Sequence, residues 1–157
     1  MESEEGEEMN IIDYFTATDQ PHWQAQIQKS DWSAGEYLYH LLKNNSLKNL
    51  VGEKTHLFLL VDGEELISFC TLAERDDVQP TDLTPWIGFV YTYPEHRGHR
   101  YAEKLLAHAE SAAHQDGAQS VYISTNHQGL YEKFGYTFLC TAIDVGGDPT
   151  RVYKKDL

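Results

Sequence analysis

The sequence predicts one domain of the mixed α/β class, and two observations support this prediction. Its 157 residues suffice for a single compact core, and 41% of them are hydrophobic. Segments with the β-branched and aromatic content of strands alternate with segments whose apolar residues follow helical spacing. The expected order is one strand, two helices, three strands, a long helix, a strand, a short helix and two final strands. We expect this domain to span residues 9–157.

Residues 1–8 are expected to lie outside the domain, as an acidic disordered tail or a vector-derived extension. They include five glutamates, and such a segment buries too little apolar surface to fold. The formal net charge of the chain is −13, and it stays acidic without this tail. Because nucleic-acid binders present a basic face to the phosphates, no nucleic-acid partner is expected.

The first third of the domain should supply a strand and two helices. Residues 11–16 have the β-branched and aromatic content of a short strand. The first helix is predicted at residues 20–29, because a proline stands in its first turn. The second helix is predicted from Ser33, which would form a capping-box pair with Glu36, to Asn44.

The middle of the chain should form three strands. Residues 56–61 and 66–73 are apolar runs joined by an Asp-Gly turn, which predicts a β-hairpin. Charges and a proline indicate a loop at residues 75–83, and a third strand follows at residues 86–92.

The last third begins with the strongest helical pattern of the chain. Over residues 95–115, tyrosine, leucine and alanine recur on one face. A strand is predicted at residues 120–124 and a short helix at residues 129–134. Residues 136–143 and 150–154 then form a final pair of strands around a Gly-Gly-Asp-Pro turn.

Composition also constrains where the protein works. No apolar run is long enough to cross a bilayer, and the N-terminus is acidic where a secretory signal would be basic. We therefore expect a cytoplasmic protein with no membrane partner. Cys70 and Cys140 lie in strand-like runs, so each is expected to be a buried, reduced thiol.

Residues 90–106 carry the first chemical signal. A predicted strand runs through a turn at Pro94 into a helix that should open with Arg97 and Gly98. A helix N-terminus presents unpaired N–H groups and a partial positive charge, which together suit a pyrophosphate. Gly98 allows the backbone to come close to such a ligand, and Arg97 and Arg100 add cationic donors.

This segment resembles motif A of the GNAT superfamily of N-acetyltransferases, Gln/Arg-x-x-Gly-x-Gly/Ala. Arg97 occupies the first position of the motif and Ala102 the last, while Arg100 stands where the family has its middle glycine. Residues 126–136 are similar to motif B of the same family, in which an Asn precedes a short helix that bears a Tyr and ends in Gly-Tyr. The two motifs stand in the family's order with one strand between them, which makes the pair more specific than either motif.

The resemblance implies the GNAT acyl-CoA N-acyltransferase fold, with a mostly antiparallel central sheet of six to seven strands flanked by about four helices. It also implies acetyl-CoA as the acyl-donor cosubstrate. Residues 90–92 would pair through their main chain with the pantetheine arm, and residues 97–102 would hold the pyrophosphate. The full set of implied cofactor contacts is Val90, Tyr91, Thr92, Arg97, Gly98, His99, Arg100, Tyr101, Ala102, Asn126 and Tyr131.

The implied function is acetyl transfer to a primary amine of a small molecule or peptide, by direct attack in a ternary complex. Tyr131 is the implied general acid, because a positioned phenol can protonate the departing thiolate. The spacing of Tyr131 relative to Phe134 would equally suit a purely structural residue of an amphipathic helix. A non-catalytic acyl-CoA-binding sensor with the same fold is the alternative function.

The base that takes the proton of the amine is left open by the sequence. Several family members keep a glutamate near the start of the fourth strand, where this chain has Thr-Pro-Trp at residues 84–86. Glu74 is the tentative base, and Asp76, Glu36 or a chain of water molecules are alternatives. The acidic charge of the chain is compatible with a cationic acceptor, and the resemblance also allows a homodimer.

Two further groups of side chains have a weaker signal. The histidines around residues 95–115 lack the flanking carboxylate pattern of a zinc site, so no metal is expected. The aromatic residues of the first two helices would either line an acceptor pocket or pack in the core. They are Trp23, Trp32, Tyr37 and Tyr39.

Overall fold

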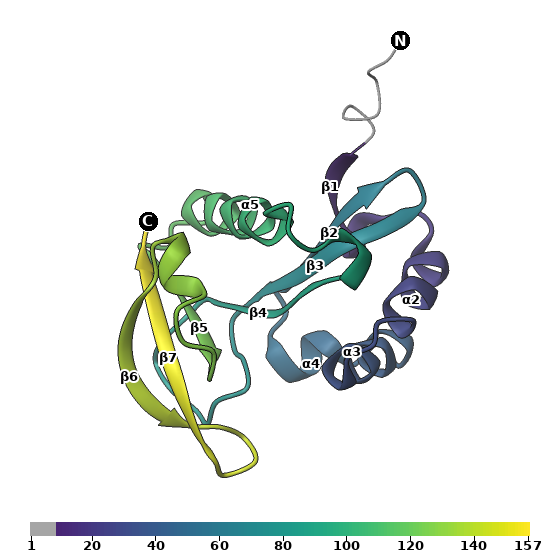
Figure 1. The fold of residues 1–157 in the computed structure, drawn as a ribbon. Helices are drawn as coiled ribbons and strands as arrows, with labels where there is room; N and C mark the ends of the chain where they lie inside the picture. The colour runs from purple at the N-terminus through teal and green to yellow at the C-terminus, as the bar shows by residue number, and fades with distance from the viewer. Residues whose placement is uncertain (1–8) are drawn as a thin grey trace.

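The computed structural model describes residues 9–157 as a seven-stranded sheet with helices on both of its faces (Figure 1). The predicted tail at residues 1–8 lies outside the described residues. The strand order is β1-β2-β3-β4-β5-β7-β6. Only β4 and β5 pair in parallel, and the other neighbours are antiparallel. The predicted mixed α/β class and mostly antiparallel sheet are therefore confirmed.

The described elements follow the predicted order, with one additional α-helix, α4, and two additional 3₁₀ helices, η1 and η2. The strands are β1 (Met9–Asp13), β2 (His56–Asp62), β3 (Glu65–Ala73), β4 (Trp86–Thr92), β5 (Ser120–Thr125), β6 (Thr137–Ile143) and β7 (Pro149–Asp156). The α-helices are α2 (Gln20–Gln28), α3 (Ser33–Lys43), α4 (Leu47–Val51) and α5 (Tyr101–Gln115), and the 3₁₀ helices are η1 (Tyr14–Thr16), η2 (Pro94–His96) and η3 (Tyr131–Phe134). Within residues 9–157, no helix has both the length and the apolar character to cross a membrane.

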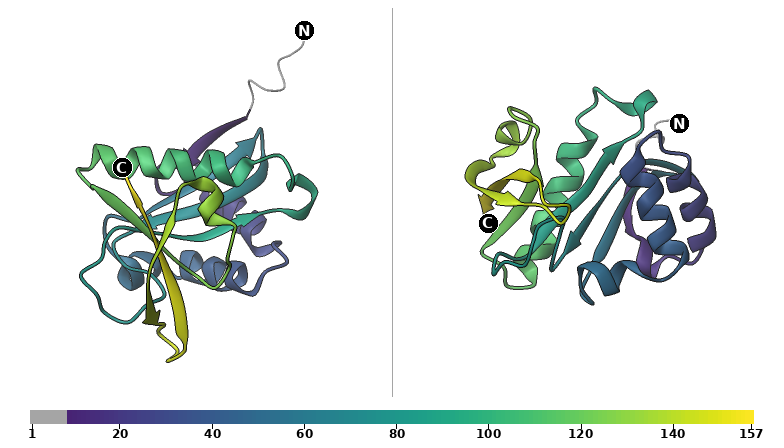
Figure 2. Two further views of the ribbon diagram at one scale, coloured as in Figure 1. Left: turned by 60° about the vertical axis from the view of Figure 1, so that its left-hand side comes forward. Right: turned by 90° about the horizontal axis from the view of Figure 1, so that it is seen from below.

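Two apolar clusters attach the helices to opposite faces of the sheet. The right-hand view of Figure 2 shows α5 on one side of the sheet and the N-terminal helices on the other. Leu57 and Leu59 of β2 pack in the cluster with α2, α3 and α4. The alternate residues Phe58 and Leu60 pack in the cluster with α5. Successive strand residues point to opposite faces, so both faces of β2 are buried. This burial explains why the strand is an unbroken apolar run.

Strands β4 and β5 separate after one pairing, between Trp86 and Tyr122. Beyond that point β4 contains a bulge, in which Phe89 and Val90 together stand opposite Cys70 of β3. Phe89 has a φ of 48°. A bulge bends its strand and increases the local twist. The second half of β4 therefore runs away from β5 and leaves one of its edges without a partner strand.

The N-terminal part of the domain differs from the prediction in three ways. The strand predicted to reach residue 16 ends at Asp13, whose carboxylate accepts a hydrogen bond from the Phe15 N–H at 3.0 Å and starts η1. The predicted capping box is wrong, because Ser33 is already the first residue of α3 and Trp32 occupies the cap without a side-chain hydrogen bond. The additional α-helix is α4, whose five residues are too few for an apolar period to appear in the sequence.

Helix α5 begins later than the sequence suggested. Residues 95–100 were predicted to be helical, but they form the end of η2 and a turn, and α5 starts at Tyr101. The φ angles of Gly98 and Arg100 are +88° and +63°, and such left-handed residues interrupt a right-handed helix. Arg97 and Gly98 therefore precede the helix rather than open it.

Glu110 of α5 connects this helix to the last strands. Its carboxylate accepts a hydrogen bond from Tyr136 Oη at 2.7 Å and pairs with Lys155 Nζ at 2.9 Å. Lys155 Nζ also donates to the Phe134 carbonyl at 2.8 Å, which ties the end of η3 to the same network. The Glu110 side chain is only 12% exposed, so water cannot easily replace a lost partner.

Replacing Glu110 with Gln is expected to lower the free energy of unfolding by about 1–2 kcal/mol, because it leaves the Lys155 ammonium without its charged partner. Urea denaturation measures this change. Glu103→Gln on the same helix is the control, since Glu103 pairs with Arg100, whose side chain is 77% exposed. We expect the control to change the free energy by less than about 0.5 kcal/mol. Equal effects in the two variants would contradict a structural role for the Glu110 network.

Candidate functional site

A cleft of about 780 Å³ lies where β4 and β5 diverge. Its walls come from β4, the turn that precedes α5, the first residues of α5, the end of β5 and η3. The loop between α2 and α3 closes one side through Asp31 and Trp32. A cleft of this size is in the range that binds small ligands and cofactors.

Most of the residues predicted to contact a cofactor line this cleft. Nine of the eleven do so, namely Val90, Tyr91, Thr92, Arg97, Gly98, Arg100, Tyr101, Ala102 and Tyr131. His99 and Asn126 are exposed and do not line it, although Thr125 and His127 on either side of Asn126 do. The cleft thus brings together two segments that stand some 30 residues apart in the sequence.

The turn before α5 presents a run of free backbone N–H groups. The Arg97 N–H bonds to the carbonyl at the start of η2 at 3.3 Å, and the Lys104 N–H makes the first bond of α5, also at 3.3 Å. Between these two, the N–H groups of residues 98–103 have no partner within the part of the chain that the structure describes. A Cβ added to Gly98 would meet nothing within 4 Å. The turn is therefore open to a ligand, and the partial positive charge of the helix N-terminus favours an anion there.

Arg100 stands where motif A has its middle glycine, and it adopts a backbone conformation that glycine favours. Its φ of +63° is a left-handed conformation, which glycine adopts without strain and which costs other residues roughly 1–2 kcal/mol. The side chain points to solvent and pairs with Glu103 at 2.9 Å. The backbone of the turn thus keeps the shape that glycine would allow. Arg97 lies closer to the strand, where its Nε donates to the Thr92 carbonyl at 2.8 Å.

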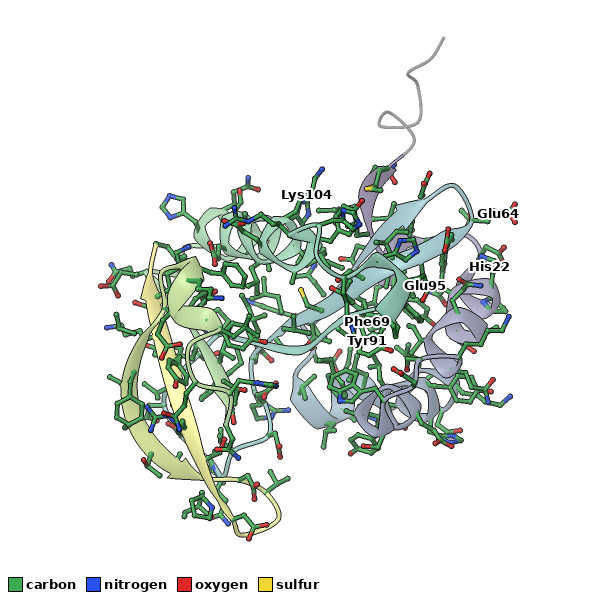
Figure 3. All side chains as sticks on the ribbon, in the orientation of Figure 1. His22, Glu64, Phe69, Tyr91, Glu95 and Lys104 are labelled. Carbon is green, nitrogen blue, oxygen red and sulfur yellow. The ribbon has the colours of Figure 1, made fainter. Side chains whose placement is uncertain are left out.

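One wall of the cleft is aromatic. The rings of Trp32 and Tyr91 stack with centroids 5.2 Å apart and planes 6° apart, and Phe89 meets Trp32 edge-on at 6.3 Å. Behind this wall, Phe69 of β3 packs beside Tyr91 with centroids 5.5 Å apart (Figure 3). Tyr91 Oη donates a hydrogen bond to the carboxylate of Asp31, which is exposed at the mouth of the cleft. Of the four aromatic residues considered in the sequence, only Trp32 lines the cleft.

Tyr131 begins η3 and lines the same cleft as Trp32 and Tyr91. It is 7% exposed, and burial raises the pKa of its phenol to about 12, with further contributions from Cys70 and from the negative charge of Asp76. Among residues 9–157, its hydroxyl has no hydrogen-bond partner. Tyr136 packs edge-on against its ring with centroids 6.1 Å apart. Tyr131 therefore retains its proton at neutral pH and keeps its hydroxyl free to donate.

The three candidate bases lie in different places. The Glu74 side chain packs beside Gly52 and lines a separate hollow at the other end of β3, so the structure does not bring it to the cleft. Glu36 is exposed on α3, where it lies 3.9 Å from His40. Asp76 is the candidate next to the cleft, because its carboxylate touches Gly88, a residue of the cleft wall.

Sequence reasoning missed the contributions of Asp31, Gly88 and Phe89 to the cleft. Asp31 lies in a short loop between helices, and the bulge at Phe89 has no sequence signature, so neither could have been found from spacing. Gly88 is a glycine inside a strand, which is a known signal for close approach of another group. One surface group within the described residues has the spacing of a cation site, with ligand atoms of Glu65, Glu95 and His96 within 4.8 Å of one another.

The chain matches the model of the acetyltransferase (GNAT) family over residues 13–136. None of the curated proteins matches it. Similar solved structures include an acetyltransferase from Streptococcus agalactiae, at 20% identity over 96% of this chain and 99% of that chain with a TM-score of 0.67. An aminoglycoside 6′-N-acetyltransferase from Enterococcus faecium is 16% identical over 94% of this chain and 96% of that one, with a TM-score of 0.67. An aminoglycoside 6′-N-acetyltransferase complexed with coenzyme A is 14% identical over 94% of this chain and 96% of that one, with a TM-score of 0.67.

These structures are too distant in sequence to show more than a shared fold, whereas the family model covers most of the chain. The matched region contains β4, the turn with free N–H groups, α5 and Tyr131. The match to the family model, the architecture of the sheet and the cleft between the diverging strands agree, and the protein belongs to the acetyltransferase (GNAT) family.

Proposed function

We propose that this protein transfers the acetyl group of acetyl-CoA to a primary amine of a small molecule or peptide, by direct attack in a ternary complex. The observation that carries the proposal is that one cleft joins the free N–H groups of residues 98–103 to the unpartnered phenol of Tyr131. Acetyl-CoA combines an anionic pyrophosphate, an amide-bearing arm and an activated acetyl thioester. The cleft offers a matching group for each of these parts.

The pyrophosphate end would be held by main-chain donors. The N–H groups of residues 98–103 can donate hydrogen bonds to the negatively charged phosphates, which the N-terminus of α5 also attracts. Arg97 and Arg100 stand beside these N–H groups. Beyond Trp86, β4 has no partner strand on the side of the cleft. The main chain of residues 90–92 can therefore pair with the amides of the pantetheine arm. An aminoglycoside 6′-N-acetyltransferase of the same fold binds coenzyme A, which supports this assignment.

Tyr131 is proposed as the general acid that protonates the sulfur of the leaving group. Burial raises its pKa to about 12, so the phenol is fully protonated over the range in which the enzyme would work. A thiolate has a pKa near 8.5 and can accept this proton when the donor is held in place. The network of Glu110 and Lys155 fixes the end of η3, and this positions Tyr131.

The acceptor would enter along the aromatic wall. A primary amine is protonated at neutral pH, and it is attracted by the exposed carboxylate of Asp31, which lies beside the aromatic wall. Two of the similar solved structures are aminoglycoside 6′-N-acetyltransferases. Aminoglycosides, polyamines and basic peptides are therefore the first acceptors to screen.

A sensor that binds acyl-CoA without catalysis is the second candidate function. It is favoured by one observation, namely that the start of β4 carries the buried Trp86, where the resemblance to the family would lead one to expect a glutamate. The two functions make the same prediction for cofactor binding and opposite predictions for turnover.

Calorimetric titration with acetyl-CoA tests the proposal. We expect a dissociation constant of about 1–100 μM, in the range of typical enzyme substrates. Desulfo-CoA should bind with similar affinity, and adenosine diphosphate should retain part of it. A thiol-release assay with the amines named above then separates the two functions. Binding with release of thiol supports the enzyme, binding without release supports the sensor, and the absence of any heat would overturn both.

A further inference from the structure

We propose that Asp76 is the general base of this reaction, delivered from the loop after β3 into the space beside Gly88 of β4. This inference rests on the proposed function and identifies the one group that the proposed mechanism leaves open. It also differs from the prediction made from the sequence, in which Glu74 was the tentative base.

The geometry at Gly88 is the first argument. A Cβ added to Gly88 would lie 2.1 Å from Asp76 Oδ1 and 3.3 Å from Thr71 Oγ1. No atom tolerates the shorter distance, so the Asp76 carboxylate occupies the place that a side chain at position 88 would take. Gly88 lines the cleft. The Asp76 carboxylate does not itself line the cleft, but it thus stands directly beside a residue of the cleft wall.

The conformation of Gly88 strengthens this argument. Its φ lies outside the left-handed region, unlike the φ of Gly98 or Gly135. Any residue could therefore adopt the backbone at position 88 without strain. The lack of a side chain at position 88 therefore makes room for the Asp76 carboxylate and is not required by the backbone conformation of the strand.

The side of the sheet on which Asp76 lies also fits an acceptor. Ile87 packs in the cluster with α5, and successive strand residues point to opposite faces. Position 88 therefore points away from α5, toward the face that carries Asp31 and Trp32. A base on this face meets an amine that arrives along the aromatic wall.

The electrostatic environment suits a base that works near neutral pH. Protein atoms crowd the half-buried Asp76, and this desolvation raises the pKa of its carboxyl to about 7, although an N–H group of Asp77 opposes the shift. The titratable groups around it are Asp77 on the same loop, whose own pKa is raised by burial and by Asp144, and Tyr131 on η3. A base whose pKa is near the operating pH is an efficient proton acceptor. The charge of Asp76 also raises the pKa of Tyr131, so the proposed base and acid interact electrostatically.

The proton transfers balance with these two groups alone. Asp76, as a carboxylate, takes one proton from the ammonium form of the acceptor and later releases it to solvent. The nitrogen lone pair then forms the C–N bond to the acetyl carbon while the C–S bond breaks and its electron pair leaves with sulfur. Tyr131 gives its proton to the sulfur, and the second proton of the nitrogen returns to Tyr131 through solvent. One ammonium and one thioester give one amide, one thiol and one free proton.

Asp76→Asn tests this assignment through the pH dependence of kcat/KM, measured between pH 6 and pH 10 by thiol release with an amine that the wild type acetylates. In the wild type, kcat/KM should rise with pH through about 7 as Asp76 ionises. The variant should lose this inflection and about 10²–10³-fold of kcat/KM at pH 7. The deficit should shrink toward pH 10, because an amine with a pKa near that of lysine then supplies its own neutral form. Asn removes a desolvated charge at constant shape, so the variant should fold.

Three further variants separate the explanations. Asp77→Asn is the matched control, and it should keep kcat/KM within about threefold at pH 7, since its carboxylate only modulates Asp76. Gly88→Ala should reproduce the loss seen in Asp76→Asn, because the added methyl group displaces the carboxylate. Glu74→Gln tests the competing base. Acetyl-CoA affinity, measured by calorimetry, should stay unchanged in Asp76→Asn, Asp77→Asn and Glu74→Gln, whose side chains do not line the cleft.

The possible failures can be told apart. Transfer by the wild type together with an unchanged pH profile in Asp76→Asn would overturn Asp76 as the base and leave the proposed function standing. Loss of the inflection in Glu74→Gln instead would overturn it in favour of Glu74. A wild type that transfers acetyl to none of the amines would overturn the proposed function, and this inference with it.

Discussion

Replacing Tyr131 with Phe is expected to reduce kcat by about 10²–10³-fold, the usual contribution of a general acid. The substitution removes only a hydroxyl that has no hydrogen-bond partner among residues 9–157. The ring keeps its packing against Tyr136, so the fold and the affinity for acetyl-CoA should both be retained. Steady-state thiol release measures kcat, and calorimetry measures the affinity.

The pH dependence of this loss distinguishes Tyr131 from Asp76. The raised pKa of the phenol, about 12, means that its acidic form is present at every pH below that value. The deficit of Tyr131→Phe should therefore be constant between pH 6 and pH 10. The deficit of Asp76→Asn, in contrast, should shrink as the pH rises, because the amine then needs no base.

Tyr136→Phe is the matched control for Tyr131→Phe. It also removes one buried hydroxyl, but that hydroxyl donates to Glu110 and does not line the cleft. We expect lower stability, by about 1 kcal/mol, and a kcat within about threefold of the wild type. If Tyr131→Phe behaved in the same way as Tyr136→Phe, Tyr131 would be a structural residue and the sulfur would take its proton from elsewhere.

The parts of the fold that could be predicted are those in which a single local sequence pattern determines the secondary structure. The hairpin of β2 and β3 could be recognised because both faces of these strands are buried, which makes each strand an apolar run bounded by a glycine turn. The order of the elements and the family resemblance followed from the same local patterns. The segment before Tyr101 could not be predicted, because the left-handed conformations of Gly98 and Arg100 interrupt a pattern that reads as one continuous helix.

The identity of the general base could not be predicted from the sequence. Glu74 and Asp76 are two residues apart in an irregular loop, and no periodicity relates the direction of a side chain to its position in such a loop. The structure sends Glu74 toward Gly52 and Asp76 toward Gly88. The signal that could have decided between them was Gly88 itself, a glycine in the middle of an otherwise bulky strand.

Replacing Ala102 with Glu is expected to weaken acetyl-CoA binding by at least about 100-fold. Ala102 lines the cleft in the first turn of α5, beside the N–H groups that would receive the pyrophosphate. A carboxylate there repels the phosphates and competes for the same donors. Glutamate is a good helix former and a negative charge in the first helical turn is favourable, so the free energy of unfolding should not fall.

Ala107→Glu provides the control, because Ala107 is exposed in the middle of the same helix and does not line the cleft. It adds the same charge and should leave the affinity within about threefold, once the ionic strength is high enough to screen distant charges. Adenosine diphosphate should lose affinity for Ala102→Glu in parallel with acetyl-CoA, since both would use the turn before α5. Unchanged binding of both ligands to Ala102→Glu would mean that the free N–H groups of residues 98–103 do not hold the pyrophosphate, and the orientation of the cofactor along β4 would then have to be reversed.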